Sequence, residues 1–307
     1  MNKSNKLAVL AYLTVCIVWG STYLAIKIAV TDMPFLSFAG IRFFSAGAII
    51  LAVSLLKGWA FPRGRQEYRT AIIAGAMLLF ISNGLICWAE QWIDSGLTAL
   101  LVASVPLFMA LIEVIVPGDH RLGWLGWFGL IVGFCGVALL VSPNLTMEGR
   151  TLPAMLAVLA ASLNWAAASI YLKRRTVSGS MLPNVGIQMF SAGVAFLIAA
   201  SLTGGISIAG ASAGGISALL YLIFIGSILA YSAFYYMLKV IPAAKAGTYA
   251  YINPIVAVFL GALILKEVVT AQTIIAASII LTGVILVQLA KVKPVIRKIL
   301  PHTALKS

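Results

Sequence analysis

Residues 35–56 read FLSFAGIRFFSAGAIILAVSLL and contain a single charged side chain, Arg42. An α-helix needs about 20 consecutive, mostly apolar residues to cross the hydrocarbon core of a bilayer, so this segment predicts a transmembrane helix. Its centre, Phe44-Ser45-Ala46-Gly47, returns 146 residues later as Phe190-Ser191-Ala192-Gly193. This repetition indicates that the chain contains the same structural unit twice.

The rest of the chain has the same apolar character. Of its 307 residues, 62% are hydrophobic and 9% are charged, whereas soluble domains carry about 25% charged residues. This composition excludes an ordinary soluble enzyme and any disordered or fibrous protein. We therefore predict an all-α membrane protein with ten transmembrane helices, at residues 7–29, 35–56, 70–92, 96–116, 123–141, 152–172, 184–203, 215–238, 244–265 and 271–290.

The basic residues predict how these helices are oriented, because Lys and Arg collect in the cytoplasmic loops of membrane proteins. With the N-terminus in the cytoplasm, 17 of the 21 Lys and Arg residues fall on the cytoplasmic side. Only Lys27, Arg150 and Lys266 fall on the other side, and Arg42 lies inside a span. Both termini are therefore expected to be cytoplasmic, with a basic tail at 292–307. This placement accounts for the net charge of +13 without a nucleic-acid partner.

Three further matches support the duplication. Residues 19–27 align with 165–173 at the same shift of 146, Pro106 aligns with Pro254 at 148, and residues 136–137 align with 283–284 at 147. We expect a first five-helix repeat at 1–145 and a second at 150–291. Because five is odd, the second repeat must enter the membrane inverted. Inverted repeats are typical of secondary transporters, whose substrate site lies near the midplane between the repeats.

The two repeats also carry motifs of a known family. The stretches 19–23 (WGSTY) and 249–254 (YAYINP) resemble the drug/metabolite transporter superfamily of the EamA repeat type. Asn83-Gly84 with Ala89-Glu90, and residues 105–108 (VPLF), are similar to one bacterial branch of it. The resemblance covers nearly the whole chain and implies a ten-helix inner-membrane carrier, in a family of which many members export amino acids or other small metabolites. Where the first repeat has Gly20-Ser21-Thr22, the second has Ala166-Ala167-Ala168, so only the first half can use that small polar group.

Residues that are unusual in lipid are candidates for a transport site. Pro106 and Pro254 fall near the middle of their helices, where proline removes a backbone hydrogen bond. We expect helix breaks at both, beside a midplane site, with a plain structural kink as the alternative. Trp19 and Trp165 lie near mid-depth, away from the interfacial aromatic belts, and either face a shared cavity or pack between helices.

The full set of expected substrate contacts combines these two tryptophans with nearby polar and aromatic residues. An unsatisfied amide is costly in a membrane, so each Asn must bond a neighbouring helix, water or a substrate. For any single Asn an interhelical hydrogen bond is the alternative. The candidates are Trp19, Ser21, Tyr23, Asn83, Trp88, Asn164, Trp165, Tyr249, Tyr251 and Asn253.

Ionisable residues within the spans are functional hypotheses by default. Glu90 is a candidate for proton coupling or for binding a substrate amine, and pairing with Lys27 or Arg42 is the alternative. Lys27 has a long stem that can reach the interface. Arg42 is placed either to bind a substrate carboxylate or to cap neighbouring helices.

Three acidic residues near the helix ends receive simpler interpretations. Glu113 is expected to pair with Arg121, with a proton role as the alternative. Asp119 and Glu267 occupy similar places after the two prolines, at opposite membrane faces, and are interpreted as helix-boundary charges.

These observations favour a secondary transporter that exports small metabolites and is coupled to the proton gradient. The sequence has no GxxxxGK[ST] loop for ATP. An intramembrane enzyme needs convergent catalytic or metal-binding residues within the spans, and no His lies in any span, so we expect neither catalysis nor a metal or other cofactor. A channel or a lipid-translocating protein on the same scaffold is the alternative. The substrate remains open among zwitterions, amphipathic cations and aromatic acids.

Overall fold

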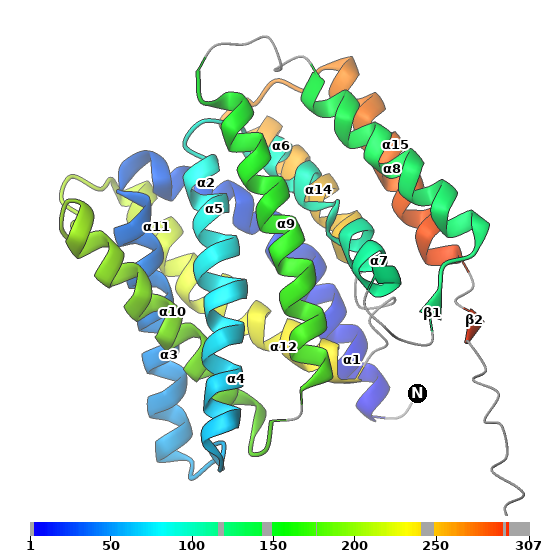
Figure 1. Cartoon of the computed structure of the whole chain (residues 1–307). Coiled ribbons are helices and arrows are strands. Elements are labelled where there is room, and N and C mark those ends of the chain that lie inside the picture. The colour runs from blue at the N-terminus through cyan, green and yellow to red at the C-terminus, as the bar shows by residue number, and fades with distance from the viewer. Residues whose placement is uncertain are drawn as a thin grey trace, which may run out of the picture.

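The computed structural model describes residues 3–115, 120–142, 149–175, 177–240, 249–290 and 293–294, and these residues are almost entirely helical (Figure 1). Several spans consist of α-helical parts joined by a wider π-helical segment. In chain order the spans are α1 (Lys3–Thr14), η1 (Val15–Trp19) and α2 (Gly20–Asp32); α3 (Phe35–Leu56); α4 (Arg65–Gly75), η2 (Ala76–Ser82) and α5 (Asn83–Ala89); α6 (Ser95–Val102) and α7 (Val105–Ile115); α8 (Trp124–Val141); α9 (Thr151–Arg174); α10 (Met181–Thr203); α11 (Ala213–Tyr221), η4 (Leu222–Leu229) and α12 (Ala230–Val240); α14 (Tyr249–Leu260) and η5 (Gly261–Leu265); and α15 (Ala271–Leu289).

In the part of the chain that the structure describes, nine helices are long and apolar enough to cross a membrane. The apolar helix Tyr249–Leu265 is shorter, and the expected beginning of that span, at residue 244, lies outside the described residues. The all-helical membrane fold is thus confirmed, with the shorter helix in the place of the ninth span. Two short strands, β1 (His120–Arg121) and β2 (Lys293–Pro294), pair antiparallel where the sequence predicted loop and tail.

The repeated Phe-Ser-Ala-Gly motif forms the crossing between α3 and α10, one of the two most extensive helix contacts in the molecule. A Cβ atom on Gly47 would collide with the backbone of Phe190, and one on Gly193 would collide with the backbone of Phe44. The rings of Phe44 and Phe190 lie 4.9 Å apart beside this contact. Because the start of each motif meets the end of the other, the two equivalent helices run antiparallel, as inverted repeats require.

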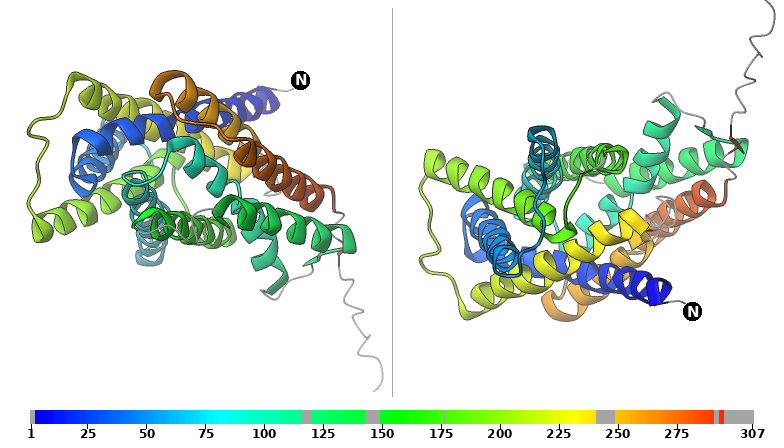
Figure 2. Two further views of the ribbon diagram at one scale, coloured as in Figure 1. Left: turned by 90° about the horizontal axis from the view of Figure 1, so that it is seen from above. Right: turned by 90° about the horizontal axis from the view of Figure 1, so that it is seen from below.

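A second pair of equivalent helices, α8 and α15, crosses in the same way. Gly133 and Gly283 approach so closely that a Cβ atom on Gly283 would collide with the Gly133 backbone, and Gly129 and Gly136 contact α15 on either side. The Gly129–Gly133 spacing therefore serves packing within the chain. The two crossing pairs lie at opposite ends of the molecule, with the remaining helices between them (Figure 2).

Two of the π-helical segments, η2 and η4, follow the repeat. Shifting η2 (Ala76–Ser82) by 146 residues gives residues 222–228, which fall within η4 (Leu222–Leu229). A π-helical turn leaves wide, irregular carbonyl positions and is frequent at functional sites. Two of these segments therefore occupy equivalent places in the two halves, in the middle of the bundle.

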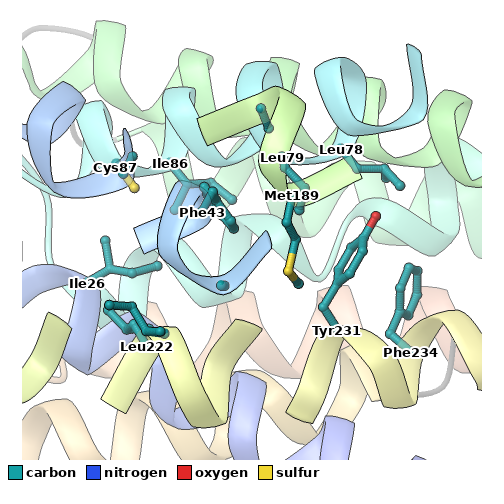
Figure 3. Packing of buried hydrophobic residues seen from close by; sticks show 14 of the residues in the cluster. Ile26, Phe43, Leu78, Leu79, Ile86, Cys87, Met189, Leu222, Tyr231 and Phe234 are labelled. Carbon is teal, nitrogen blue, oxygen red and sulfur yellow. The ribbon is translucent and has the colours of Figure 1, made fainter. Parts of the chain in front are cut away.

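A large hydrophobic cluster fills the space between these central helices (Figure 3). Phe43 from α3, Leu79 from η2 and Met189 from α10 are almost fully buried, and so is Phe234 from α12. Figure 3 shows Tyr231 and Phe234 rising from α12 towards Leu78 on η2. This core packs helices of both repeats against each other.

The two expected proline breaks have different outcomes. At Pro106 the helix is interrupted, because α6 ends at Val102 and α7 begins at Val105. At Pro254 the expected break is wrong, since α14 continues through the proline from Tyr249 to Leu260. One proline removes a single backbone hydrogen bond, and α14 tolerates this loss without ending. The described part of that span departs from α-helical geometry only later, at η5.

Candidate functional site

A cavity of about 660 Å³, a value that includes its open part, lies between the two repeats. The first repeat contributes lining residues from α3, α6 and α7 and from the spans of η1 and η2, and the second from α9, α14 and the span of η4. Six of the predicted site residues line it: Trp19, Tyr23, Arg42, Asn83, Trp165 and Tyr249.

The equivalent tryptophans meet at this cavity. The rings of Trp19 and Trp165 lie 5.4 Å apart, edge to face. Tyr249 lies edge to face against Trp19 at 5.4 Å, and Phe234 lies 4.8 Å from Trp19. Edge-to-face pairs at such distances are favourable beyond the area they bury. The result is a rigid aromatic wall built from both halves of the chain.

Arg42 is the charged residue of the cavity wall. Its side chain is only 4% exposed. The Nε–H donates to Ser227 Oγ at 2.9 Å, and the guanidinium lies over the Phe43 ring at 4.6 Å. Nη1 is buried and has no hydrogen-bond partner. A guanidinium in this setting has unused capacity to bind an anion, because a buried donor without a partner is costly.

The three candidate asparagines have separate tasks. Asn83 lines the cavity, and its amide donates to the Leu78 carbonyl at 3.2 Å. Asn164 donates to the Met77 carbonyl at 2.6 Å and to Ser82 Oγ at 2.9 Å. The amide of Asn253, oriented to satisfy its neighbours, donates to the carbonyls of Cys16 at 2.9 Å and Tyr249 at 3.2 Å.

These asparagines all donate to main-chain carbonyls of π-helical segments. The carbonyls of residues 77 and 78 belong to η2 and that of residue 16 belongs to η1, and π-helical turns disturb the regular bonding of main-chain carbonyls. The amides supply donors to these irregular segments. Asn164 and Asn253 therefore join helices in the structure and do not line the cavity.

Three further candidates also lie outside the cavity wall. Ser21 Oγ bonds Tyr221 Oη at 2.7 Å and so joins the first span to α11. The Tyr251 hydroxyl donates to the Val284 carbonyl at 3.1 Å. Trp88 is partly buried and lines a separate apolar groove beside Phe35 and Phe196. Their expected contact with substrate has no support from the position of the cavity.

Lys27 and Glu90 are neighbours but do not form an ion pair through the Glu90 carboxylate. Lys27 Nζ donates to the main-chain carbonyls of Glu90 at 2.6 Å and Ile93 at 3.0 Å. It thus caps the end of α5, where a cation is favourable. The Glu90 side chain is fully buried, and both its carboxylate oxygens lack hydrogen-bond partners. It lies one turn from Ile86, which lines the cavity, but Glu90 does not line it.

The other acidic residues lie at the helix ends. Glu113 is partly buried near the end of α7, and the side chain of its expected partner Arg121 lies outside the described residues, as does Asp119. Glu267 follows η5 and accepts hydrogen bonds from the first residues of α6: Ser95 N at 2.9 Å, Ser95 Oγ at 2.7 Å and Gly96 N at 3.0 Å. Its charge therefore serves a helix boundary in the opposite repeat.

Several cavity residues were missed by the sequence analysis, among them Thr22, Phe43, Ser227 and Tyr231. Small hydroxyl residues are common in membrane helices, so nothing in the sequence singled out Ser227. Tyr231 was visible as part of a tyrosine-rich stretch, and its hydroxyl donates to Gln188 Oε1 at 2.6 Å. Among the described residues, no three His, Cys, Asp or Glu side chains cluster to hold a metal ion.

A multi-pass helical chain whose two repeats enclose a cavity with polar and aromatic walls has the architecture of a membrane transporter. The chain matches the model of the EamA-like transporter family over residues 6–142 and 152–289. It belongs to this family and is a membrane transporter.

Individual relatives agree with this assignment. The chain is 36% identical over 289 residues to the "Uncharacterized inner membrane transporter YedA" of Escherichia coli, covering 92% of each chain. It is 25% identical over 290 residues to the "Probable amino-acid metabolite efflux pump" of Escherichia coli, covering 91% of this chain and 94% of that one. A protein of known crystal structure shares the fold with a TM-score of 0.65 at 19% identity, over 91% of this chain and 96% of the other.

Proposed function

We propose that the protein is a secondary transporter of the inner membrane that exports small metabolites through the cavity by alternating access. The observation that carries this proposal is the position of the cavity: equivalent residues of the two repeats, Trp19 and Trp165, meet in its wall. In inverted-repeat transporters the substrate site lies at the repeat interface, and one repeat rocks against the other around it. The glycine crossings at the two ends of the molecule are the contacts about which such a movement would occur.

The direction of transport is proposed from the relatives and from the charge pattern. One relative is named as an amino-acid metabolite efflux pump and another as an inner membrane transporter. The excess of Lys and Arg in one set of loops supports cytoplasmic termini. Export then means that the cavity loads from the side on which both termini lie.

We assign proton coupling to Glu90. Its carboxyl group is fully buried beside the cavity and both oxygens lack hydrogen-bond partners. A carboxylate cannot stay charged in such surroundings without compensation, so gaining and losing a proton is the chemistry available to it. Glu113 is the second candidate, because it is the other acidic side chain within the predicted spans of the first repeat.

The test is flux into and out of liposomes that contain the purified full-length chain. Ligands found by thermal stabilisation of the protein are supplied on one side, and protein-free liposomes serve as the blank. Trp19→Ala removes part of the cavity wall and is expected to reduce saturable flux at least tenfold. Trp124→Ala is the matched control, because Trp124 is 79% exposed on the outer face of α8.

Saturable exchange that depends on Trp19 supports the transporter. Single-channel currents with no saturation would instead identify a channel. Equal flux in the Trp19 and Trp124 variants would mean that the cavity is not the route.

A further inference from the structure

The cavity wall has an unbalanced charge. Of the residues that line it in the described part of the chain, Arg42 alone is charged at neutral pH, and no carboxylate lines the cavity. Arg42 Nη1 and both Glu90 oxygens lack hydrogen-bond partners, so the two groups interact electrostatically at a distance but do not form a hydrogen-bonded ion pair. A buried cation that has no anion in contact with it is unfavourable. The part of the cavity that Arg42 lines is therefore suited to a negative group.

Two hydrogen-bond donors are available at that position. Arg42 Nη1 offers an unused N–H. Ser227 Oγ accepts from Arg42 Nε at 2.9 Å, so the hydroxyl proton of Ser227 can be donated to another group. Both side chains are almost fully buried, with exposures of 4% and 1%. Arg42 and Ser227 thus place a cationic donor and a hydroxyl donor in the same part of the cavity wall, and a cationic donor favours an anionic acceptor.

The inverted repeat shows that the charge is not a requirement of the helix packing. The shift of 146 places Gln188 of α10 at the position of Arg42, two residues before the shared Phe-Ser-Ala-Gly motif. Gln188 is fully buried and accepts the Tyr231 hydroxyl at 2.6 Å. The equivalent helix thus packs with a neutral amide at this site. The presence of a charged guanidinium at this position in the first repeat is therefore not explained by helix packing.

The aromatic residues of the cavity wall indicate what the uncharged part of the ligand should be. Trp19, Trp165 and Tyr249 present aromatic surfaces to the cavity, and Phe43 is already covered by the Arg42 guanidinium. Aromatic walls favour flat apolar groups through stacking and edge contacts. An ammonium group would have no carboxylate to pair with and would lie in the same cavity as Arg42.

We propose that the site selects organic monoanions, with one carboxylate bound by Arg42 and Ser227 and a flat apolar group held among Trp19, Trp165 and Tyr249. This inference rests on the proposed function only in taking the cavity as the substrate site. It excludes cations as preferred ligands and ranks zwitterions below anions.

The test measures binding to the purified full-length chain in detergent with three probes that share a phenyl group: 3-phenylpropanoate, 3-phenylpropylamine and phenylalanine. We expect 3-phenylpropanoate to bind at least tenfold more tightly than the other two. Arg42→Gln places the second repeat's residue in the first repeat and is expected to weaken 3-phenylpropanoate by about 10- to 100-fold, the range for a charge-assisted hydrogen bond. Ser54→Ala is the matched control, because it removes another buried polar group of α3, which bonds the Ile50 carbonyl and does not line the cavity, and it should change affinity less than about threefold.

If Arg42→Gln does not fold, Ser227→Ala replaces it and is expected to weaken binding of the anion about 10- to 100-fold, as for one hydrogen bond to a charged group. Equal or tighter binding of the amine or of phenylalanine overturns the proposal. So does the absence of 3-phenylpropanoate binding to the wild type, or unchanged affinity in the folded Arg42 variant.

Binding and flux separate this inference from the proposed function. Anion binding that depends on Arg42, with no flux in liposomes, would retain the anion site and reject the transporter. Saturable flux of a cation that is unchanged by Arg42→Gln would retain the transporter and reject the anion site.

Discussion

Replacing Glu267 with Ala tests how the two repeats are held together at one face of the molecule. Glu267 belongs to the second repeat, yet its carboxylate takes three hydrogen bonds from Ser95 and Gly96 at the start of α6 in the first. Asp94 occupies the N-cap position of α6 but makes no side-chain capping bond. Glu267 therefore supplies from a distance the cap that the local sequence does not.

The magnitude follows from these contacts. The side chain of Ser95 is fully buried. Removing the Glu267 carboxylate therefore leaves the Ser95 hydroxyl and the backbone N–H groups of Ser95 and Gly96 without their hydrogen-bond acceptor. Losing an N-cap costs about 0.5–2 kcal/mol, and hydrogen bonds to a charged group contribute about 1.5–3 kcal/mol each. Because water can reach the partly exposed Glu267 position and replace some of these bonds, we expect Glu267→Ala to cost about 2–4 kcal/mol.

Denaturant titration of the full-length protein in mixed micelles measures this change. Val268→Ala is the matched control, because its side chain is in the same loop and 80% exposed, and it should shift the free energy of unfolding by less than about 0.5 kcal/mol. Combining Glu267→Ala with Ser95→Ala in a double-mutant cycle isolates the bond between the two side chains. A Glu267 variant as stable as the control, or additive effects in the cycle, would refute the assignment of a cap across the repeats.

Three further changes test other parts of the structure. Gly193→Ala places a methyl group against the Phe44 backbone and should destabilise the protein by about 1–3 kcal/mol in the same titration, whereas Gly64→Ala, in open space, should not; equal effects would contradict the tight crossing. Burial raises the pKa of the Asp94 carboxyl group above its usual value of 3.8, and the nearby Glu267 carboxylate raises it further, while the Lys27 ammonium group lowers it. The contribution of Asp94 to stability is therefore greatest below pH 3.8 and is lost as the pH rises through the pKa of the folded state. Asp94→Asn should raise the denaturant concentration at the unfolding midpoint at pH 7 and leave it nearly unchanged near pH 3. A lower midpoint at pH 7 would show that the charged Asp94 stabilises the fold, contrary to this reasoning. Glu90→Gln should abolish the pH dependence of liposome flux while ligand binding persists, and an unchanged pH profile would remove Glu90 from coupling.

The membrane fold was predictable because its signals are simple. Long apolar runs locate the spans, and the recurrence of residues 44–47 at 190–193 marks the duplication. The same four residues turned out to form the contact between the two copies. The sequence could not show that Pro254 would sit inside a continuous helix, because the effect of one missing hydrogen bond depends on the packing around it. Nor did it reveal the π-helical segments, which have no residue signature.

The site was predictable only in outline. Trp19, Trp165, Arg42 and Tyr249 were singled out because large or charged groups at mid-depth need a reason, and they do line the cavity. Asn164 met the same criterion but bonds main chain and serine instead. A polar residue in a membrane helix indicates that its side chain needs a hydrogen-bond partner, but the sequence does not show which neighbour is that partner. That choice depends on how the helices are rotated and on the irregular carbonyls of η1 and η2, which only the folded chain defines.

Comparing the two repeats separates residues that build the scaffold from residues that carry chemistry. Gly47 and Gly193 recur because each copy needs the same close crossing, and Trp19 and Trp165 recur because both copies supply the cavity wall. Arg42 has become Gln188, and Gly20-Ser21-Thr22 has become Ala166-Ala167-Ala168. In the first repeat Ser21 bonds Tyr221, and Thr22 lines the cavity beside Arg42. A symmetric scaffold can present the cavity to both sides of the membrane in turn, whereas a ligand with one charged end needs an asymmetric wall. The differences between the repeats are therefore the positions at which substrate specificity is expected to be encoded.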